Sequence, residues 1–140
     1  MDAVQEGFLI SHVERLTGVD SRTIDFWDRS AFISPSLQGA TGKGSQRLWS
    51  FDDLVAIKVA GQLRGLGVSL QALRKVTAYL RGRTPPRTFA NTFLVSNGVD
   101  VFERSGDALI STLRQPGQGA LAWVVDVGAI VEELQAALAA

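Results

Sequence analysis

Arginine and aromatic side chains are concentrated in residues 17–29, where they could bind a nucleic acid. Arg22 and Arg29 can face outward on a short helix, and a guanidinium group donates hydrogen bonds to phosphates and to base edges. Ile24 and Trp27 lie three positions apart, so both can face the core. The pattern predicts a helix with one buried face and one basic, exposed face.

A short turn separates this helix from another one before it. Gly18 and Val19 mark the turn. Asp20 or Ser21 can cap the second helix, because a short side-chain oxygen accepts a hydrogen bond from a backbone N–H at the helix start. Two short helices joined by a glycine-bearing turn are typical of a helix-turn-helix, whose second helix fits the major groove of DNA.

A glycine-rich stretch follows at residues 38–45, with three glycines and no large apolar side chain. It could be a simple mobile loop. It could also be a wing, the tip of a hairpin that lies along the DNA backbone, with Lys43 and Arg47 supplying charge. A P-loop would require Gly-Lys-Ser/Thr at the start of a helix that follows a strand. Lys43-Gly44-Ser45 lacks that order, so nucleotide binding is not expected.

Three short motifs stand in order along the first half of the chain. They are Ile10 to Val19 with Phe26-Trp27-Asp28, then Gln46 to Leu54, then Leu66 to Leu70. The first resembles the opening of a MerR-family winged helix-turn-helix, the second that family's wing-to-helix junction, and the third its turn into the fourth helix. Three motifs in register are far more specific than one. The resemblance covers about residues 8–81 and implies a regulator that binds double-stranded DNA.

The resemblance also implies which side chains contact DNA. Arg22 opens the recognition helix, Arg47 would bind phosphate, and Trp49 would lie beneath the wing. The full set of expected DNA-binding residues is Arg22, Thr23, Asp25, Phe26, Arg29, Lys43, Gln46, Arg47 and Trp49. Phe26 and Trp27 match the family's paired aromatic residues. A packing role is favoured for Trp27, whereas both roles stay open for Phe26.

The sequence departs from the family's pattern in three places. Asp25 stands where the family usually has arginine, and Gln46 where it often has tyrosine. An acid beside a phosphate lowers affinity, so we expect DNA binding to be weaker, differently selective, or assisted by a bound partner. Pro85 and Pro86 interrupt the long dimerisation helix that usually follows the fourth helix. The family's dimer geometry therefore cannot be carried over.

Apolar spacing predicts four helices in residues 1–83, over 11–16, 21–29, 51–66 and 69–81. Ser11 with Glu14 forms a capping-box pattern for the first helix, and Ser50 with Asp53 forms one for the third.

The ends of the third and fourth helices carry further signals. Gly67 is expected to stop the third helix in the left-handed conformation, and Ser69 to cap the fourth. Asp52, Asp53 and Arg81 are expected to be solvated.

Residues 84–91 are expected to form a linker, because prolines cannot continue a helix. Residues 92–140 predict a small ββαβα-like unit. Its strands are expected at 92–96 and 99–103, joined by a tight turn at Asn97-Gly98. A short helix over 107–114 would be capped by Asp107, a central strand would run over 120–127, and a final helix over 129–138.

The composition limits the possible functions. The chain has 140 residues and no net charge, but residues 1–83 carry eleven Lys and Arg against eight Asp and Glu, and residues 84–140 carry three against six. A mildly basic first half permits nucleic-acid binding. The absence of cysteine excludes disulfides and thiolate metal sites. With no leader-like segment and no apolar run of membrane-spanning length, we expect a cytoplasmic protein that does not enter a membrane.

Enzymatic motifs are absent from the sequence. There is no Gly-x-Ser-x-Gly elbow and no His-Glu-x-x-His, and His12 is the only histidine. We therefore expect no enzymatic activity, cofactor or metal.

Together these patterns predict an α+β fold: a four-helix winged helix-turn-helix domain in residues 1–83, a linker over 84–91, and a small α+β domain over 92–140. We expect a transcriptional regulator that binds an inverted-repeat operator as a homodimer. Its dimer or partner surface is expected at Trp123, Val131, Leu134 and Leu138. Two alternatives stay open: an antitoxin or phage-type accessory DNA-binding protein whose tail binds a protein, and a regulator that senses a small molecule.

Overall fold

The computed structural model describes residues 7–39, 46–82, 91–97, 101–108 and 122–139. The chain divides into two compact units, residues 1–82 and residues 83–139. The first unit is helical, and the second contains a sheet and a helix. The chain thus has the mixed helix-and-sheet architecture that its sequence predicts.

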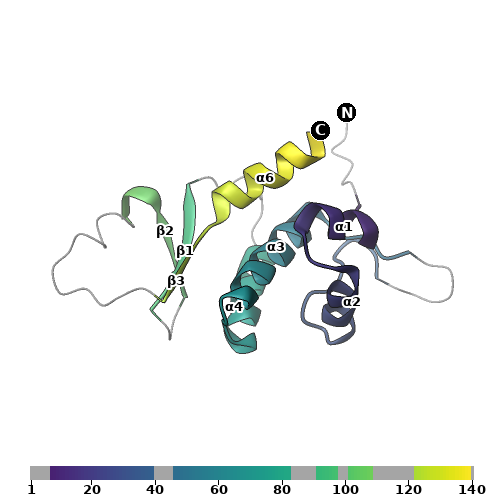
Figure 1. Cartoon of the computed structure of the whole chain (residues 1–140), viewed down its shortest axis with the longest axis horizontal. Helices are drawn as coiled ribbons and strands as arrows, with labels where there is room; N and C mark the ends of the chain where they lie inside the picture. The colour runs from purple at the N-terminus through teal and green to yellow at the C-terminus, as the bar shows by residue number, and fades with distance from the viewer. Residues whose placement is uncertain (1–6, 40–45, 83–90, 98–100, 109–121, 140) are drawn as a thin grey trace. The chain divides into compact units, whose positions relative to one another are not determined.

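Among its described residues the helical unit has four helices: α1 (Ile10–Thr17), α2 (Ser21–Arg29), α3 (Phe51–Gly65) and α4 (Leu70–Gly82) (Figure 1). Each lies within one residue of its predicted bounds at either end. α3 packs against both α1 and α4, and α1 also packs against α2. The longest helix of the unit is therefore also its central one.

Apolar side chains cover most of the surface of α3, and a helix that is apolar all round belongs in the interior of a protein. Its buried apolar residues are Leu54, Val55, Ala56, Ile57, Val59, Ala60 and Leu63. The other helices bury one stripe each, consisting of Val13 and Leu16 from α1, Ile24 and Trp27 from α2, and Leu73, Val76 and Leu80 from α4.

The start of α1 differs from its prediction. The capping-box assignment of Ser11 is wrong, because α1 begins after Leu9, whose apolar side chain makes no capping hydrogen bond. Glu14, the expected partner of Ser11, instead accepts a hydrogen bond of 2.9 Å from the backbone N–H of Ser21. This contact satisfies a donor at the start of α2 and fixes the turn between the two helices.

The caps predicted for α2 and α3 are confirmed. Asp20 accepts a hydrogen bond of 2.7 Å from the backbone N–H of Thr23 at the start of α2. At the start of α3, the Ser50 hydroxyl accepts from the N–H of Asp53 and the Asp53 carboxylate accepts from the N–H of Ser50. This reciprocal pair satisfies two donors that lack partners within the helix.

Gly67 ends α3 in the left-handed conformation, with φ +83°. The N–H of Gly67 donates to the carbonyl of Arg64 at 3.0 Å, and the N–H of Val68 donates to that of Leu63 at 3.1 Å. These two bonds form a Schellman motif, which uses carbonyls that have no partner at the end of a helix. The predicted stop is therefore confirmed.

Asp53 is buried and forms an ion pair with the partly buried Arg81, so the prediction that both are solvated is wrong. Asp53 is 1% exposed, and its Oδ1 accepts from Nε of Arg81 at 3.0 Å. Its Oδ2 accepts from the N–H and hydroxyl of Ser36, at 2.8 and 2.7 Å, and from the N–H of Ser50 at 2.9 Å. Arg81 also donates to the carbonyl of Ser34. One carboxylate thus joins α3, α4 and the segment that leaves α2.

The base of the predicted wing is a pair of antiparallel bridges. Leu48 donates its N–H to the carbonyl of Gln38 at 2.8 Å, and Gln38 donates back at 3.2 Å. Phe8 and Trp49 exchange two bonds of 2.9 Å. Residues 40–45 between the arms, including Lys43, lie outside the described residues.

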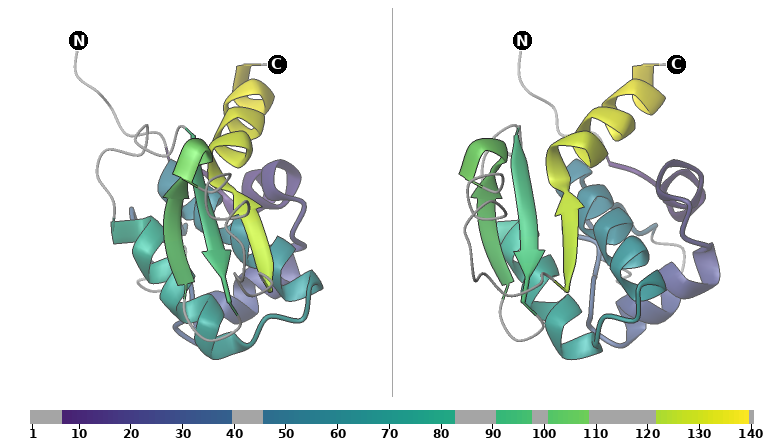
Figure 2. Two further views of the ribbon diagram at one scale, coloured as in Figure 1. Left: turned by 90° about the vertical axis from the view of Figure 1, so that its left-hand side faces the viewer. Right: turned by 60° about the vertical axis from the view of Figure 1, so that its left-hand side comes forward.

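The second unit contains β1 (Thr92–Ser96), β2 (Val101–Ser105), β3 (Trp123–Asp126) and α6 (Val127–Ala139). The three strands form an antiparallel sheet in the order β2-β1-β3, and α6 packs against β1 (Figure 2). The prediction that the strand within 120–127 is central is wrong. β1 is central and buries four of its five residues, whereas Val125 is the only fully buried residue of β3.

The hairpin of β1 and β2 is confirmed, but its register differs from the prediction. Ser96 lies opposite Val101, whereas a two-residue turn at Asn97-Gly98 would have placed Ser96 opposite Val99. β2 therefore runs from Val101 rather than over 99–103, and residues 98–100 lie outside the described residues.

The short helix predicted over 107–114 is described only at its start. Residues 106–108 are helical, and the hydroxyl of Ser105 accepts a hydrogen bond of 3.2 Å from the N–H of Ala108. The cap at this point is therefore Ser105 rather than Asp107. The remainder of the predicted helix and residues 120–121 of the predicted strand lie outside the described residues.

We predict that Gly67→Ala lowers the free energy of unfolding by about 1–2 kcal/mol, because a Cβ disfavours the left-handed conformation. No atom lies within 4 Å of that Cβ, so backbone strain alone is tested. Gly65→Ala is the matched control: its Cβ also meets nothing within 4 Å and its φ is not positive. The control should leave stability unchanged or raise it by up to about 1 kcal/mol. Urea unfolding measures both, and equal effects would contradict the prediction.

Candidate nucleic-acid interface

The exposed and buried faces of α2 are those expected from the sequence. Arg22 is exposed, Phe26 is 58% exposed, and the side chain of Arg29 is 66% exposed. Ile24 is fully buried and Trp27 is 5% exposed. The exposed face of α2 therefore presents two cations and a large aromatic ring that contributes little to packing.

Trp27, by contrast, packs in the hydrophobic core. Its ring meets that of Phe32 edge to face, with centroids 5.3 Å apart, and the guanidinium of Arg64 lies 5.4 Å from the Trp27 centroid. Both arrangements match the charge distribution of an aromatic ring, which is negative on its face and positive at its edge. The packing role favoured for Trp27 is confirmed.

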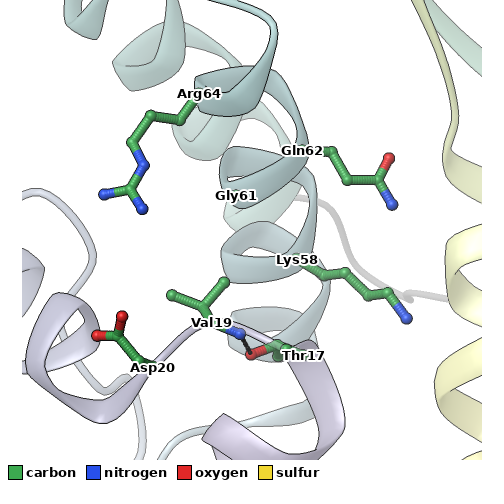
Figure 3. A pocket seen from close by; sticks show the side chains of 8 residues that line it. Thr17, Val19, Asp20, Lys58, Gly61, Gln62 and Arg64 are labelled. Atoms are coloured by element: carbon green, nitrogen blue, oxygen red, sulfur yellow. Dashed lines mark hydrogen bonds between the residues drawn. The ribbon is translucent and has the colours of Figure 1, made fainter.

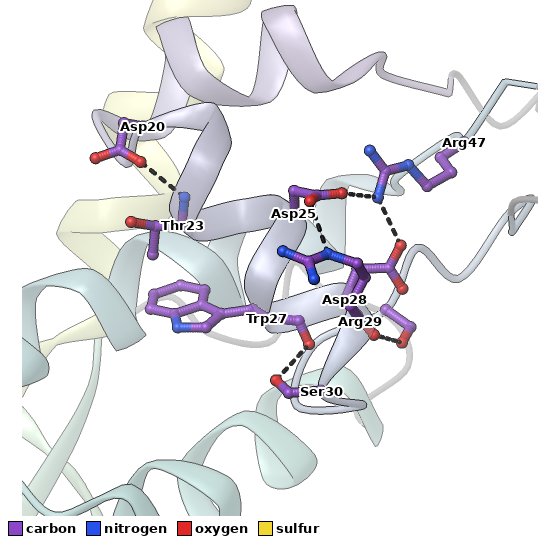
Figure 4. A network of polar contacts seen from close by, with 9 residues as sticks. Asp20, Thr23, Asp25, Trp27, Asp28, Arg29, Ser30 and Arg47 are labelled. Atoms are coloured by element: carbon purple, nitrogen blue, oxygen red, sulfur yellow. Dashed lines mark hydrogen bonds and ion pairs between the residues drawn. The ribbon is translucent and has the colours of Figure 1, made fainter.

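An ion-pair network joins the base of the wing to α2 (Figure 4). Nη1 of Arg47 contacts Oδ1 of Asp25 at 2.9 Å and Oδ2 of Asp28 at 2.8 Å. The other oxygen of Asp25 accepts from Nε of Arg29 at 2.9 Å. Two cations and two anions thus balance each other along one side of the recognition helix.

The network favours the charged forms of Asp25 and Arg47. Hydrogen bonds from Arg29 and then from Arg47 lower the pKa of the Asp25 carboxyl, although partial burial opposes them. The hydrogen bond to Asp28 is the main cause that raises the pKa of Arg47. The formal charges of the network cancel.

The ring of Trp49 also holds Arg47 in place. Its guanidinium lies 5.2 Å from the ring centroid of Trp49, and Trp49 is fully buried. Trp49 therefore supports Arg47 and offers no surface of its own for contact with DNA. Gln46 is exposed beside it, Thr23 is half-buried on α2, and Lys43 lies outside the described residues.

Two members of this surface were missed by the sequence analysis. Asp28 binds Arg47 together with Asp25, and Arg64 covers Trp27. The signal for Asp28 was present, because residues three positions apart on a helix are neighbours. No sequence signal places Arg64, which comes from α3 and reaches α2 only through the fold.

A pocket of about 280 Å³ lies behind the turn of the helix-turn-helix (Figure 3). Its walls come from the turn and from α3, and the charges of Asp20, Lys58 and Arg64 are mixed in sign. Val19 points toward Gly61, where an added Cβ would lie 2.8 Å from the Val19 Cγ2 atom. The absence of a side chain at Gly61 thus allows Val19 to pack closely against α3, and this contact positions the turn.

The residues expected at a dimer or partner surface differ in exposure. Val131 is 7% exposed and Leu134 is fully buried, whereas Leu138 is 39% exposed and Trp123 is half-buried. Leu138 is therefore the only residue of the predicted α6 stripe with substantial exposed surface.

Other kinds of site were sought among the described residues. No three His, Cys, Asp or Glu side chains gather there in a way that could hold a metal ion. No described helix is long and apolar enough to cross a membrane.

Comparison with known proteins gives matches of two kinds. A family model described as MerR HTH family regulatory protein matches residues 8–80. The chain is also similar to uncharacterized HTH-type transcriptional regulators of Mycobacterium bovis and of two Mycobacterium tuberculosis strains, each 36% identical over 105 residues. These residues are 75% of this chain and 46% of each relative, so the chain spans about half the length of these relatives. The alignment is longer than the family match and extends past residue 80.

We predict that Arg29→Gln and Arg47→Gln each raise the pKa of Asp25 toward its ordinary value of 3.8, the first more than the second. Because the folded-state pKa is lowered, the stability that Asp25 contributes is present above that ordinary value. It is lost as the pH falls through the lower, folded-state value. Carboxyl NMR titration measures the shift. Lys75→Gln, which removes an exposed cation from α4, should leave it unchanged, and an equal response in all three variants would refute the network.

Proposed function

The chain belongs to the MerR HTH family of regulatory proteins, and from this we propose that it controls transcription by binding a specific DNA sequence. The exposed face of α2 carries the proposal, because Arg22, Phe26 and Arg29 all stand out from the packed helical unit. A recognition helix needs such a face to enter the major groove. The function has no catalytic step.

The other parts of the surface fit complementary roles. Arg22 lies in the first turn of α2, from which a recognition helix contacts base edges and phosphates. Arg47 lies at the base of the wing, beside that helix, and would bind the DNA backbone. Phosphate contacts fix the position of a protein on DNA, and base contacts select the sequence.

We further propose that the chain binds an inverted repeat as a homodimer, because one helix-turn-helix reads only a half-site. The sheet offers a surface for self-association. Phe102 and Val124 both lie opposite Val95 on β1, so they share one face of the sheet, and they are 37% and 40% exposed. Apolar side chains gathered on one face are typical of an interface.

We predict that a pool of random duplexes yields a motif bound by the full chain. Arg22→Ala should weaken binding to that motif by about 1–3 kcal/mol if Arg22 reads a base. Arg47→Ala should weaken binding to all duplexes and reduce the slope of affinity against salt by about one. Affinities measured at several salt concentrations distinguish the two effects.

Lys75→Ala is the charge-matched control, because Lys75 is exposed on α4, outside α2 and the wing. It should keep both the selected motif and the affinity. If the wild-type chain binds no duplex in a salt-dependent manner, the proposed function is wrong.

For the dimer, we predict that Val124→Arg shifts the mass in sedimentation equilibrium from dimer to monomer. A charge placed in an apolar interface must lose its hydration, which is costly. Leu138→Arg tests the end of α6 in the same way, and we expect it to stay dimeric. If only Leu138→Arg dissociates, α6 forms the interface. If the wild-type chain is monomeric, the sheet unit is free for a protein partner or a small molecule.

A further inference from the structure

Asp25 occupies an unusual place for an acidic side chain. It lies on α2 between Arg22 and Arg29, which precede and follow it by one helical turn, and next to the exposed Phe26. Residues three and four positions apart share a helix face. Asp25 therefore belongs to the same outward surface as the two arginines, and its side chain is 37% exposed.

The two ion pairs of Asp25 fix the direction of its carboxylate (Figure 4). Arg29 binds Oδ2 and Arg47 binds Oδ1, each at 2.9 Å, so each oxygen accepts one hydrogen bond from a different element. An ionised carboxylate has about four acceptor sites. Each oxygen can therefore accept a further hydrogen bond, and the ion pairs fix the orientation of the carboxylate before DNA binds.

The same pairs reduce the electrostatic obstacle to DNA binding. A lone carboxylate at this position would be repelled by the phosphates that flank the major groove. Arg29 and Arg47 are both bound directly to Asp25, and with Asp28, which also binds Arg47, the network carries no net formal charge. The Asp25 carboxylate can thus approach a base edge as part of a neutral group, with the cation of Arg22 one helical turn away on the same face.

The chemistry of the base edges decides which base such an acceptor suits. In the major groove, guanine presents two acceptors, and thymine an acceptor and a methyl group. Adenine presents its amino donor beside the N7 acceptor, whereas cytosine presents only its N4 amino donor. A carboxylate that can only accept hydrogen bonds therefore matches cytosine.

We propose that Asp25 is a specificity-determining residue that selects a cytosine in each half-site by accepting a hydrogen bond from the N4 amino group. This inference rests on the proposed function, since it requires that α2 enters the major groove. Asp28 serves a different purpose. Its side chain is only 18% exposed and it holds Arg47, so it positions the wing arginine without reading a base.

The test begins with motif selection from random duplexes by the full-length wild-type chain, Asp25→Asn and Asp28→Asn. The wild type should select a motif with a fixed cytosine in each half-site. Asp25→Asn should change the preference at that position toward adenine, which an asparagine amide binds through N6 and N7. Asp28→Asn removes the same charge from the same helix, and it should keep the cytosine.

A modified duplex then tests the single hydrogen bond. Replacing the selected cytosine with pyrimidin-2-one removes the N4 amino group and keeps the ring. The wild-type chain should lose about 10- to 150-fold in affinity, because hydrogen bonds to charged groups are worth about 1.5–3 kcal/mol. Asp25→Ala should bind the modified and unmodified duplexes equally well.

The outcomes separate this inference from the function on which it rests. If the wild type selects no motif, both fail. If the wild type selects a motif that Asp25→Asn keeps unchanged, the inference alone is overturned. If neither Asp25 variant binds DNA, the modified duplex with the wild-type chain decides, and an unchanged affinity overturns the inference.

Discussion

The buried carboxylate of Asp53 is the constraint on which the helical unit depends. Burying a charge is unfavourable unless the charge is paired and hydrogen-bonded, and Asp53 meets both conditions through Arg81, Ser36 and Ser50. Its partners come from the start of α3, the end of α4 and the segment that leads into the wing. Removing any of them would leave part of the carboxylate unsatisfied, so the three segments hold their positions together.

This arrangement determines how the DNA-binding surface is built. Because Ser36 is fixed by Asp53, the first arm of the wing begins at a defined place, and Leu48 pairs with Gln38 on the second arm. Arg47 precedes Leu48 and bonds to α2 through two carboxylates. The wing base and the recognition helix are therefore joined by ion pairs.

The sequence was informative where the physical cause is local. Apolar spacing and short caps predicted all four helices of the first unit to within one residue. It was less informative where the partner is distant along the chain. Asp53 and Arg81 were predicted to be solvated because their pairing depends on how α3 and α4 pack. The neighbouring Asp52 is also partly buried, and this burial raises the pKa of its carboxyl, with a smaller contribution from the charge of Asp53. The apolar run at 120–127 similarly suggested a central strand, but strand order is set by pairing.

The strand order β2-β1-β3 also has a consequence for how the second unit folds. β1 pairs with β2 through Ser96 and Val101, which are close along the chain, and with β3 through Ser96 and Trp123, which are far apart. Closing a longer loop costs more conformational entropy and slows folding. The hairpin should therefore form first and leave the other edge of β1 open until β3 arrives. During synthesis that edge is a transient template for pairing with a second chain.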